Sequence, residues 1–209
     1  MTDQELAEWL RPLRRPIAVI DCTASSAPFL NRLSAPGRVV ITATRSGSEL
    51  QFAHFGEFMA GAIADPSADL DKDGQTSLLE AFLAASHRVE EFYKQAGRLT
   101  TEHALLDDNG DGQGVSADWF EGLRATHAAR NGSPIDGPRA HQWHLVMSAS
   151  EQAIPQELRA RRDEIELAIE SLRQKKVAMP QDVYYKQLEE LLLKLARLYE
   201  QIDVENKGS

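Results

Sequence analysis

The sequence predicts an α/β fold with a mainly parallel sheet and flanking helices, followed by an antiparallel α-helical hairpin. Two short runs rich in β-branched residues, 16–21 and 38–43, are bounded by turn residues, as buried parallel strands usually are. Helical patterns precede, separate and follow these runs. Near the C-terminus the composition shifts toward Glu, Lys, Arg and Leu. We therefore expect an α/β segment over residues 1–149 and a helical hairpin or coiled-coil module over residues 150–209.

Length and composition favour a folded chain. With 209 residues, of which 42% are hydrophobic, the chain can bury at least one core. The net charge of −9, without a basic stripe, argues against nucleic acid or an anionic membrane as partner, because either needs clustered Lys and Arg. Cations are the more natural ligands. The single Cys22 excludes an internal disulfide and leaves the redox compartment open.

The helices of the first module follow from apolar spacing. The first sixteen residues form an amphipathic pattern without the apolar stretch of a signal peptide, so no export signal is expected in them. Short helices are expected over 25–34 and 55–63, the second ending before Pro66. A long helix is expected over 77–95. Two strands are few for a complete sheet, so we expect this segment to be part of a larger domain.

The region between the long helix and the C-terminal module is polar and rich in glycine. Within it, residues 116–130 are expected to form a short helix and residues 143–147 an edge strand.

The C-terminal module has apolar residues at helical spacing on both sides of Pro180. After Pro180 they recur with four-three spacing, which is the seam of a coiled coil: Tyr184, Leu188, Leu191, Leu195, Leu198 and Ile202. The break at 178–181 is short enough to fold two helices into an antiparallel hairpin. One interpretation is a hairpin that closes on itself or on the α/β segment. The other is an interface for a homo-oligomer or a protein partner.

The strongest motif is DLDKDGQTSLLE at 69–80, which agrees with an EF-hand calcium loop at six positions. Those at positions one, three, five, six, nine and twelve are Asp69, Asp71, Asp73, Gly74, Ser77 and Glu80. A hard cation takes six to eight oxygens, so alternate aspartates point inward and the carbonyl of Gln75 adds another ligand. Glu80 closes the shell, and Ser77 also caps the following helix. The plainer interpretation is an acidic turn with a helix cap.

Two residues around this loop argue against a calmodulin-like pair of loops. Thr76 replaces the aliphatic residue at position eight, which a paired loop uses for a short β contact. Pro66 prevents the incoming helix from running into the loop. We expect an isolated, rigid loop that supports the structure.

A second, weaker match is DDNGDGQGVSAD at 107–118. Asp107, Asn109 and Asp111 take the first three ligand positions, and Asp118 takes position twelve, where an aspartate is too short to close the shell as a glutamate does. Two interpretations of this segment stay open: a second calcium site and a glycine-rich turn without a metal.

Cys22 follows an expected strand, where α/β hydrolytic folds often present a nucleophile. No histidine stands in a recognisable signature with it, so a buried inert thiol is the favoured interpretation. His141 and His144 have metal-like spacing, but in a strand their side chains would face opposite sides.

The stretch from Ala18 to Gly114 resembles the latter part of a bacterial caspase-like or legumain-like domain. The resemblance rests on VIDCTASSAPFLNRLSAPGRVVITATRSGSE and ADLDKDGQTSLLEAF. In that family the nucleophile turn reads Asp-x-Cys-x-Ser-Gly-Gly and a later strand ends Thr-Ala-Thr, as in Thr42 to Thr44 here. The turn departs from the family pattern, because the cysteine position falls on Ala24, so that Cys22 stands two residues too early. The family's His-Gly pair is also missing from the chain.

This resemblance implies a caspase-like fold without peptidase activity. The leading hypothesis is a calcium-binding pseudoenzyme that serves as a scaffold or interaction protein. The alternative is a cysteine hydrolase in which Cys22 acts with His54, His103 or a histidine of a partner chain. A structural loop of weak to moderate affinity suits the calcium concentration outside cells and favours an extracytoplasmic setting, although the localisation itself is left open.

Overall fold

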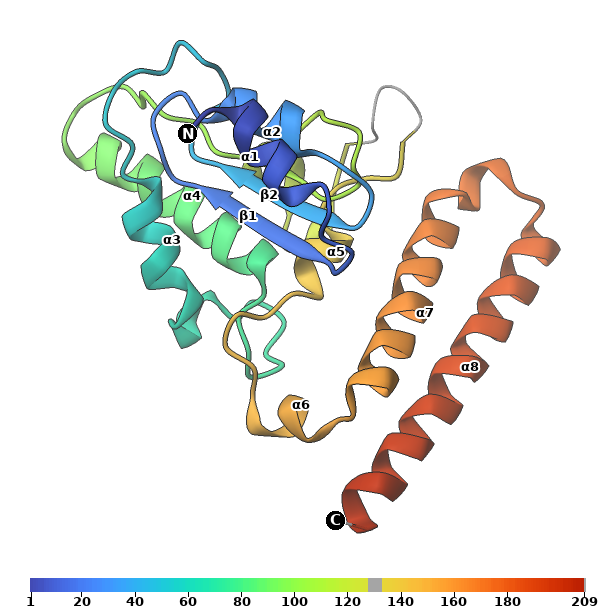
Figure 1. The fold of residues 1–209 in the computed structure, drawn as a ribbon. Helices are drawn as coiled ribbons and strands as arrows, with labels where there is room; N and C mark the ends of the chain where they lie inside the picture. Colours follow the sequence, from blue (N-terminus) through green and yellow to red (C-terminus); the bar gives the residue numbers. More distant parts are fainter. Residues whose placement is uncertain (128–132, 209) are drawn as a thin grey trace. The chain divides into compact units, whose positions relative to one another are not determined.

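A computed structural model describes residues 1–127 and 133–208 (Figure 1). The chain divides into two compact units, Met1–Val146 and Met147–Ser209, so the second unit begins three residues before the expected position 150. The molecule is of the mixed α/β class. In the described part of the chain, none of the helices combines the length and the apolar character that a membrane span requires.

Unit 1 is built on a three-stranded sheet in the order β1–β2–β3. The strands β1 (Ile17–Asp21) and β2 (Arg38–Thr42) are parallel, whereas β3 (Leu105–Asp107) is antiparallel to β2. The sheet is therefore mixed, which corrects the prediction of a mainly parallel sheet.

The reversal of β3 has a topological cause. Two helices, α3 (Phe55–Ile63) and α4 (Leu78–Gln95), separate β2 from β3. The end of α4 lies beside the start of α3, since the rings of Phe92 and His54 are 4.4 Å apart. The two helices thus bring the chain back to the end of the sheet at which β2 finished, and β3 must run the opposite way.

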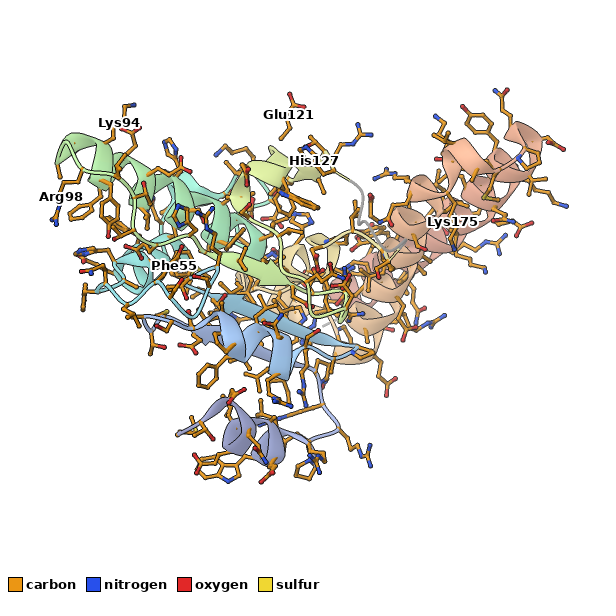
Figure 2. The ribbon with its side chains drawn as sticks, turned by 90° about the horizontal axis from the view of Figure 1, so that it is seen from above. Phe55, Lys94, Arg98, Glu121, His127 and Lys175 are labelled. Carbon is orange, nitrogen blue, oxygen red and sulfur yellow. The ribbon has the colours of Figure 1, made fainter. Side chains whose placement is uncertain are left out.

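Helices cover both faces of the sheet (Figure 1). Because side chains alternate along a strand, Val40 packs with α2 (Ala27–Leu33) and α1 (Asp3–Leu10), while Val39 and Ile41 pack with α3 and α4. In Figure 2, Phe55 points into the second of these layers, whereas Lys94 and Arg98 point outward from the end of α4 and beyond it. The core of unit 1 therefore lies mainly between the sheet and the α3–α4 pair.

Two predicted elements of unit 1 are wrong. Instead of a helix over 116–130, the chain forms a 3-10 turn, η2 (Ala117–Trp119), and a small hairpin of β4 (Phe120–Glu121) and β5 (Arg124–Ala125). Gly122, at φ 60°, supplies the left-handed residue that turns this hairpin. Residues 128–130 of the predicted helix lie outside the described residues.

The predicted edge strand at 143–147 is a single β-bridge between His144 and Ser77. Leu78 N donates to Trp143 O at 2.7 Å. The pairing cannot extend because α4 begins directly after Ser77.

Unit 2 is the helical hairpin that the sequence predicts. It consists of α6 (Ala149–Ala153), α7 (Gln156–Gln174), the 3-10 turn η3 (Lys176–Ala178) and α8 (Gln181–Gly208). Leu158 of α7 packs with Leu198 and Ile202 of α8, so the two long helices are antiparallel. Arg162 donates to Glu151 through Nη1 and Nη2, at 2.8 and 2.7 Å, and ties α6 to α7.

Candidate metal centre

The first acidic loop joins the 3-10 turn η1 (Pro66–Ala68) to α4. One oxygen from each of Asp69, Asp71 and Asp73 lies within 4.8 Å of the others. Asp69 is buried, and the other two are exposed. Three carboxylates at this separation repel one another unless a cation neutralises them, so the group could hold a metal ion.

Backbone N–H groups fix the orientation of these carboxylates. The bonds run from Lys72 N to Asp69 (2.7 Å), from Gly74 N to Asp69 (3.1 Å), from Asp73 N to Asp71 (3.2 Å) and from Gln75 N to Asp73 (2.8 Å). Lys72 and Gly74 are left-handed, at φ 64° and 86°. The pKa of Asp69 lies below its usual value: burial acts to raise it, but the N–H groups of Gly74 and Lys72 outweigh that effect.

Glu80 lies outside the group of three aspartates and links both ends of the loop. Its Oε1 accepts from Leu70 N at 2.7 Å, and its Oε2 accepts from the N–H and the hydroxyl of Ser77, both at 2.8 Å. Ser77 Oγ in turn accepts from Glu80 N and caps α4. The predicted ligands Ser77 and Glu80 therefore contact each other, while Gln75 binds Asp73 through its backbone N–H.

Two histidines adjoin the loop, contrary to the expectation that they face opposite sides of a strand. His141, at the end of α5 (Pro138–His141), places Nε2 3.0 Å from Asp71 Oδ2. His144 Nε2 is 3.9 Å from Asp73 Oδ2. The prediction failed because His141 ends a helical turn and His144 forms an isolated bridge, so no pleat separates them.

The second loop repeats the backbone pattern of the first, position for position. Its bonds run from Gly110 N to Asp107 (3.0 Å), from Gly112 N to Asp107 (2.7 Å), from Asp111 N to Asn109 (2.7 Å) and from Gln113 N to Asp111 (2.8 Å). Positions four and six are again left-handed, with Gly110 at φ 83° and Gly112 at φ 75°. The structure thus brings Asp107, Asn109 and Asp111 into the arrangement that the motif predicts.

A residue from another part of the chain takes the place of Glu80 in the second loop. Asp136 Oδ1 accepts from Asp108 N at 2.8 Å and from Asn109 N at 3.1 Å, as Glu80 does from positions two and three of the first loop. Asp118, which occupies position twelve, instead accepts from the Ser116 hydroxyl. No spacing in the sequence points to Asp136, because it follows the motif by 18 residues.

Buried carboxylates concentrate negative charge beside this second loop. Asp107, Asp108 and Asp136 are at most 4% exposed. Burial, assisted by the charge of Asp108, raises the pKa of Asp136 to about 8. Burial likewise raises the pKa of Asp108 to about 6, although its oxygens accept from Gly137 N and Ala140 N at the start of α5. A divalent cation at the loop would neutralise part of this charge.

Cys22 has the environment of an inert thiol. Burial, together with the charge of Asp21, raises its pKa, whereas a nucleophilic cysteine needs a depressed pKa. The two histidines considered as its base have other partners. The ring of His54 packs on Phe92, and His103 Nδ1 lies 2.7 Å from Glu49.

Comparison of the chain with protein-family models, with curated proteins and with solved structures finds no match.

Proposed function

We propose that this protein binds calcium at 69–80 and again at the second loop, and that the ions support the fold rather than take part in catalysis. The observation that carries the proposal is the shared network of N–H bonds around two loops of the form Asp-x-Asp/Asn-x-Asp-Gly. Such a network holds alternate side-chain oxygens toward one point, which is the arrangement that calcium needs.

The chemistry of the donors favours calcium over softer metals. Both loops offer carboxylate, amide and carbonyl oxygens, and neither contains a cysteine. Zinc and copper prefer thiolates and imidazoles. Magnesium prefers six oxygen ligands, several of them from water, in a tight octahedron. His141 and His144 lie beside the first loop: His141 is within hydrogen-bond distance of Asp71, at 3.0 Å, and His144 is 3.9 Å from Asp73.

A structural role follows from the segments that the loops connect. The first loop joins η1 to the cap of α4, and α4 is a principal helix of the core. The second loop is held by Asp136, just before α5, and by Asn31 of α2, which donates to Gly112 O at 2.7 Å. An ion in the first loop would therefore fasten η1 to α4, and an ion in the second loop would fasten segments that are distant in sequence.

The same proposal includes a caspase-like, non-catalytic origin for unit 1. The Thr-Ala-Thr segment supports the turn after β1, since Thr44 Oγ1 lies 3.1 Å from Ser26 Oγ and accepts from Ala27 N at 3.2 Å. The raised pKa of Cys22 favours a scaffold or interaction role over the alternative of a cysteine hydrolase.

The decisive experiment is calorimetric titration of metal-free protein with calcium. We expect two binding events in the wild type. Asp73→Asn should abolish only the first, because asparagine keeps the acceptor for Gln75 N but removes the charge; Glu80→Gln should weaken the same event. Asp136→Asn should abolish only the second event, for the corresponding reason.

Asp118→Asn is the matched control. It removes one acidic charge near the second loop at a residue whose carboxylate, within the described part of the chain, accepts from the Ser116 hydroxyl alone, so both binding events should persist. Circular dichroism checks that each variant is folded. Folded wild-type protein that gives no heat and no thermal shift with calcium would refute the proposal.

A further inference from the structure

The helix α8 has a second apolar face that α7 does not cover. Tyr184, Leu198 and Ile202 are buried in the hairpin. On the other face, Tyr185 and Leu192 are each 48% exposed and Leu193 is 50% exposed. An open depression of about 440 Å³ runs along this face, lined by Tyr185, Leu188, Glu189, Leu192, Leu193 and Ala196. Figure 1 shows α8 paired along its length with α7 alone within unit 2.

This second face has the spacing of a helix–helix contact. Tyr185, Leu188, Leu192, Ala196 and Tyr199 recur every three or four residues, as the residues of a seam do. A surface helix usually has one apolar stripe, whereas a helix with two stripes belongs in a bundle with two neighbours. The second apolar stripe of α8 therefore calls for a second helical neighbour.

The charges beside the face are symmetric about Leu193. Lys186 and Glu200 lie seven residues on either side of it, and Glu189 and Arg197 lie four residues on either side. At 100° per residue, these four side chains fall on the same edge of the face as Leu193. All four are exposed, and none forms an ion pair within residues 1–127 and 133–208.

This arrangement is complementary to itself when reversed. In an antiparallel pair of α8 helices with Leu193 at the two-fold axis, each Lys186 faces Glu200 of the other copy and each Glu189 faces Arg197. In a parallel pair, by contrast, this edge of each helix would lie on the opposite side of the interface from the same edge of its partner, so these charges could not pair. We propose that two copies of this chain associate through α8 in this antiparallel register and form a closed two-fold dimer whose hairpins make a four-helix bundle.

Sedimentation equilibrium of the full chain tests the dimer. The wild type should show twice the mass of one chain at high concentration and dissociate on dilution. Leu193→Glu places two carboxylates at the axis and should weaken association roughly tenfold or more. Val177→Glu is the matched control: Val177 is fully exposed in η3, outside the face, so the same substitution there should leave the dimer intact.

Charge exchange tests the register. Glu189→Arg and Arg197→Glu should each weaken the dimer, because each places like charges together, and the double variant should restore it. A double variant as weak as either single one would overturn the antiparallel register. Wild-type protein that is monomeric at every concentration, or a dimer indifferent to Leu193→Glu, would overturn the proposal itself. Calcium removal should leave the dimer unchanged, so this test is independent of the metal sites.

Discussion

Single carboxylates differ in what their burial costs. Asp71 and Asp73 are exposed and can share their charge with water, but Asp107, Asp108 and Asp136 are buried together. An ionised buried carboxylate is expensive unless hydrogen bonds or a cation compensate it. The N–H donors of Asp108 and Asn109 compensate Asp136 only in part, so burial and the charge of Asp108 still raise its pKa to about 8.

Removing the charge of Asp136 should change how stability depends on pH. In metal-free protein the folded state keeps this proton up to about pH 8, whereas an exposed aspartate loses it near pH 4. Between these values the unfolded state binds fewer protons, so ionisation of Asp136 lowers wild-type stability as pH rises. The stability of Asp136→Asn relative to wild type should therefore increase from about pH 4 to about pH 8. Above about pH 8 the difference should stay constant.

Urea unfolding at a series of pH values, with a calcium chelator present, measures this effect. The free energy of unfolding of Asp118→Asn should depend on pH in the same way as that of the wild type. A constant difference between Asp136→Asn and wild type across the whole range would show that Asp136 titrates normally.

Cys22 should react slowly with iodoacetamide in the folded protein. Burial and the charge of Asp21 raise its pKa, so little thiolate is present near neutral pH. Alkylation in urea-unfolded protein at the same pH should be much faster. Rapid alkylation of the folded protein, with a rate that increases with pH and reaches half of its maximum below pH 7, would instead favour the cysteine hydrolase alternative.

At the scale of the element, the start of α4 combines a cap with a loop closure. Ser77 and Glu80 form a reciprocal capping box, and Glu80 also reaches back to Leu70 N. The sequence predicts the cap, because Ser followed three residues later by Glu precedes an apolar run. It does not predict the contact with Trp143 and His144, since nothing in a local pattern shows which distant segment lies beside the cap.

Ser77→Ala should destabilise the protein by about 1 kcal/mol through loss of the cap. The measurement is the urea midpoint at unchanged slope. Ser86→Ala is a suitable control, because the Ser86 hydroxyl donates to Phe82 O within the same helix and does not cap it. Equal losses in the two variants would contradict a special role for the cap.

Elements defined by periodic apolar residues agree with the sequence, and those in the polar region do not. The helices α3, α4, α7 and α8 and the strands β1 and β2 follow apolar spacing that is visible in the chain. The segment around Gly122 reads as helical because Trp119, Phe120 and Leu123 have suitable spacing, yet the left-handed glycine forms a hairpin instead. Asp136 escapes prediction for a different reason, because its partners are set by tertiary packing alone.

At the scale of the whole molecule, the two acidic loops and the exposed face of α8 belong to different units. Calcium should therefore stabilise unit 1 and leave unit 2 unaffected. All three tryptophans, Trp9, Trp119 and Trp143, lie in unit 1, so tryptophan fluorescence reports on that unit alone.

Thermal melts should separate the two responses. Calcium at a hundred times its dissociation constant adds about 2.7 kcal/mol per site, which should raise the fluorescence midpoint by several degrees. The part of the far-ultraviolet circular dichroism change that comes from unit 2 should keep its midpoint. A single transition that calcium shifts equally in both signals would contradict independent units.

The carboxylate that closes each loop, Glu80 in the first and Asp136 in the second, comes from a different distance along the chain. This distance determines how early in folding each loop can form. The first loop carries its own Glu80 within twelve residues, so its closing carboxylate is available as soon as that short segment exists. The second loop waits for Asp136, which requires the intervening chain to be brought back at an entropic cost that grows with its length. An ion would then bind the first loop early in folding. An ion would bind the second loop only after the native topology has formed. If both loops bind calcium as proposed, a newly made chain would acquire the two ions in a fixed order.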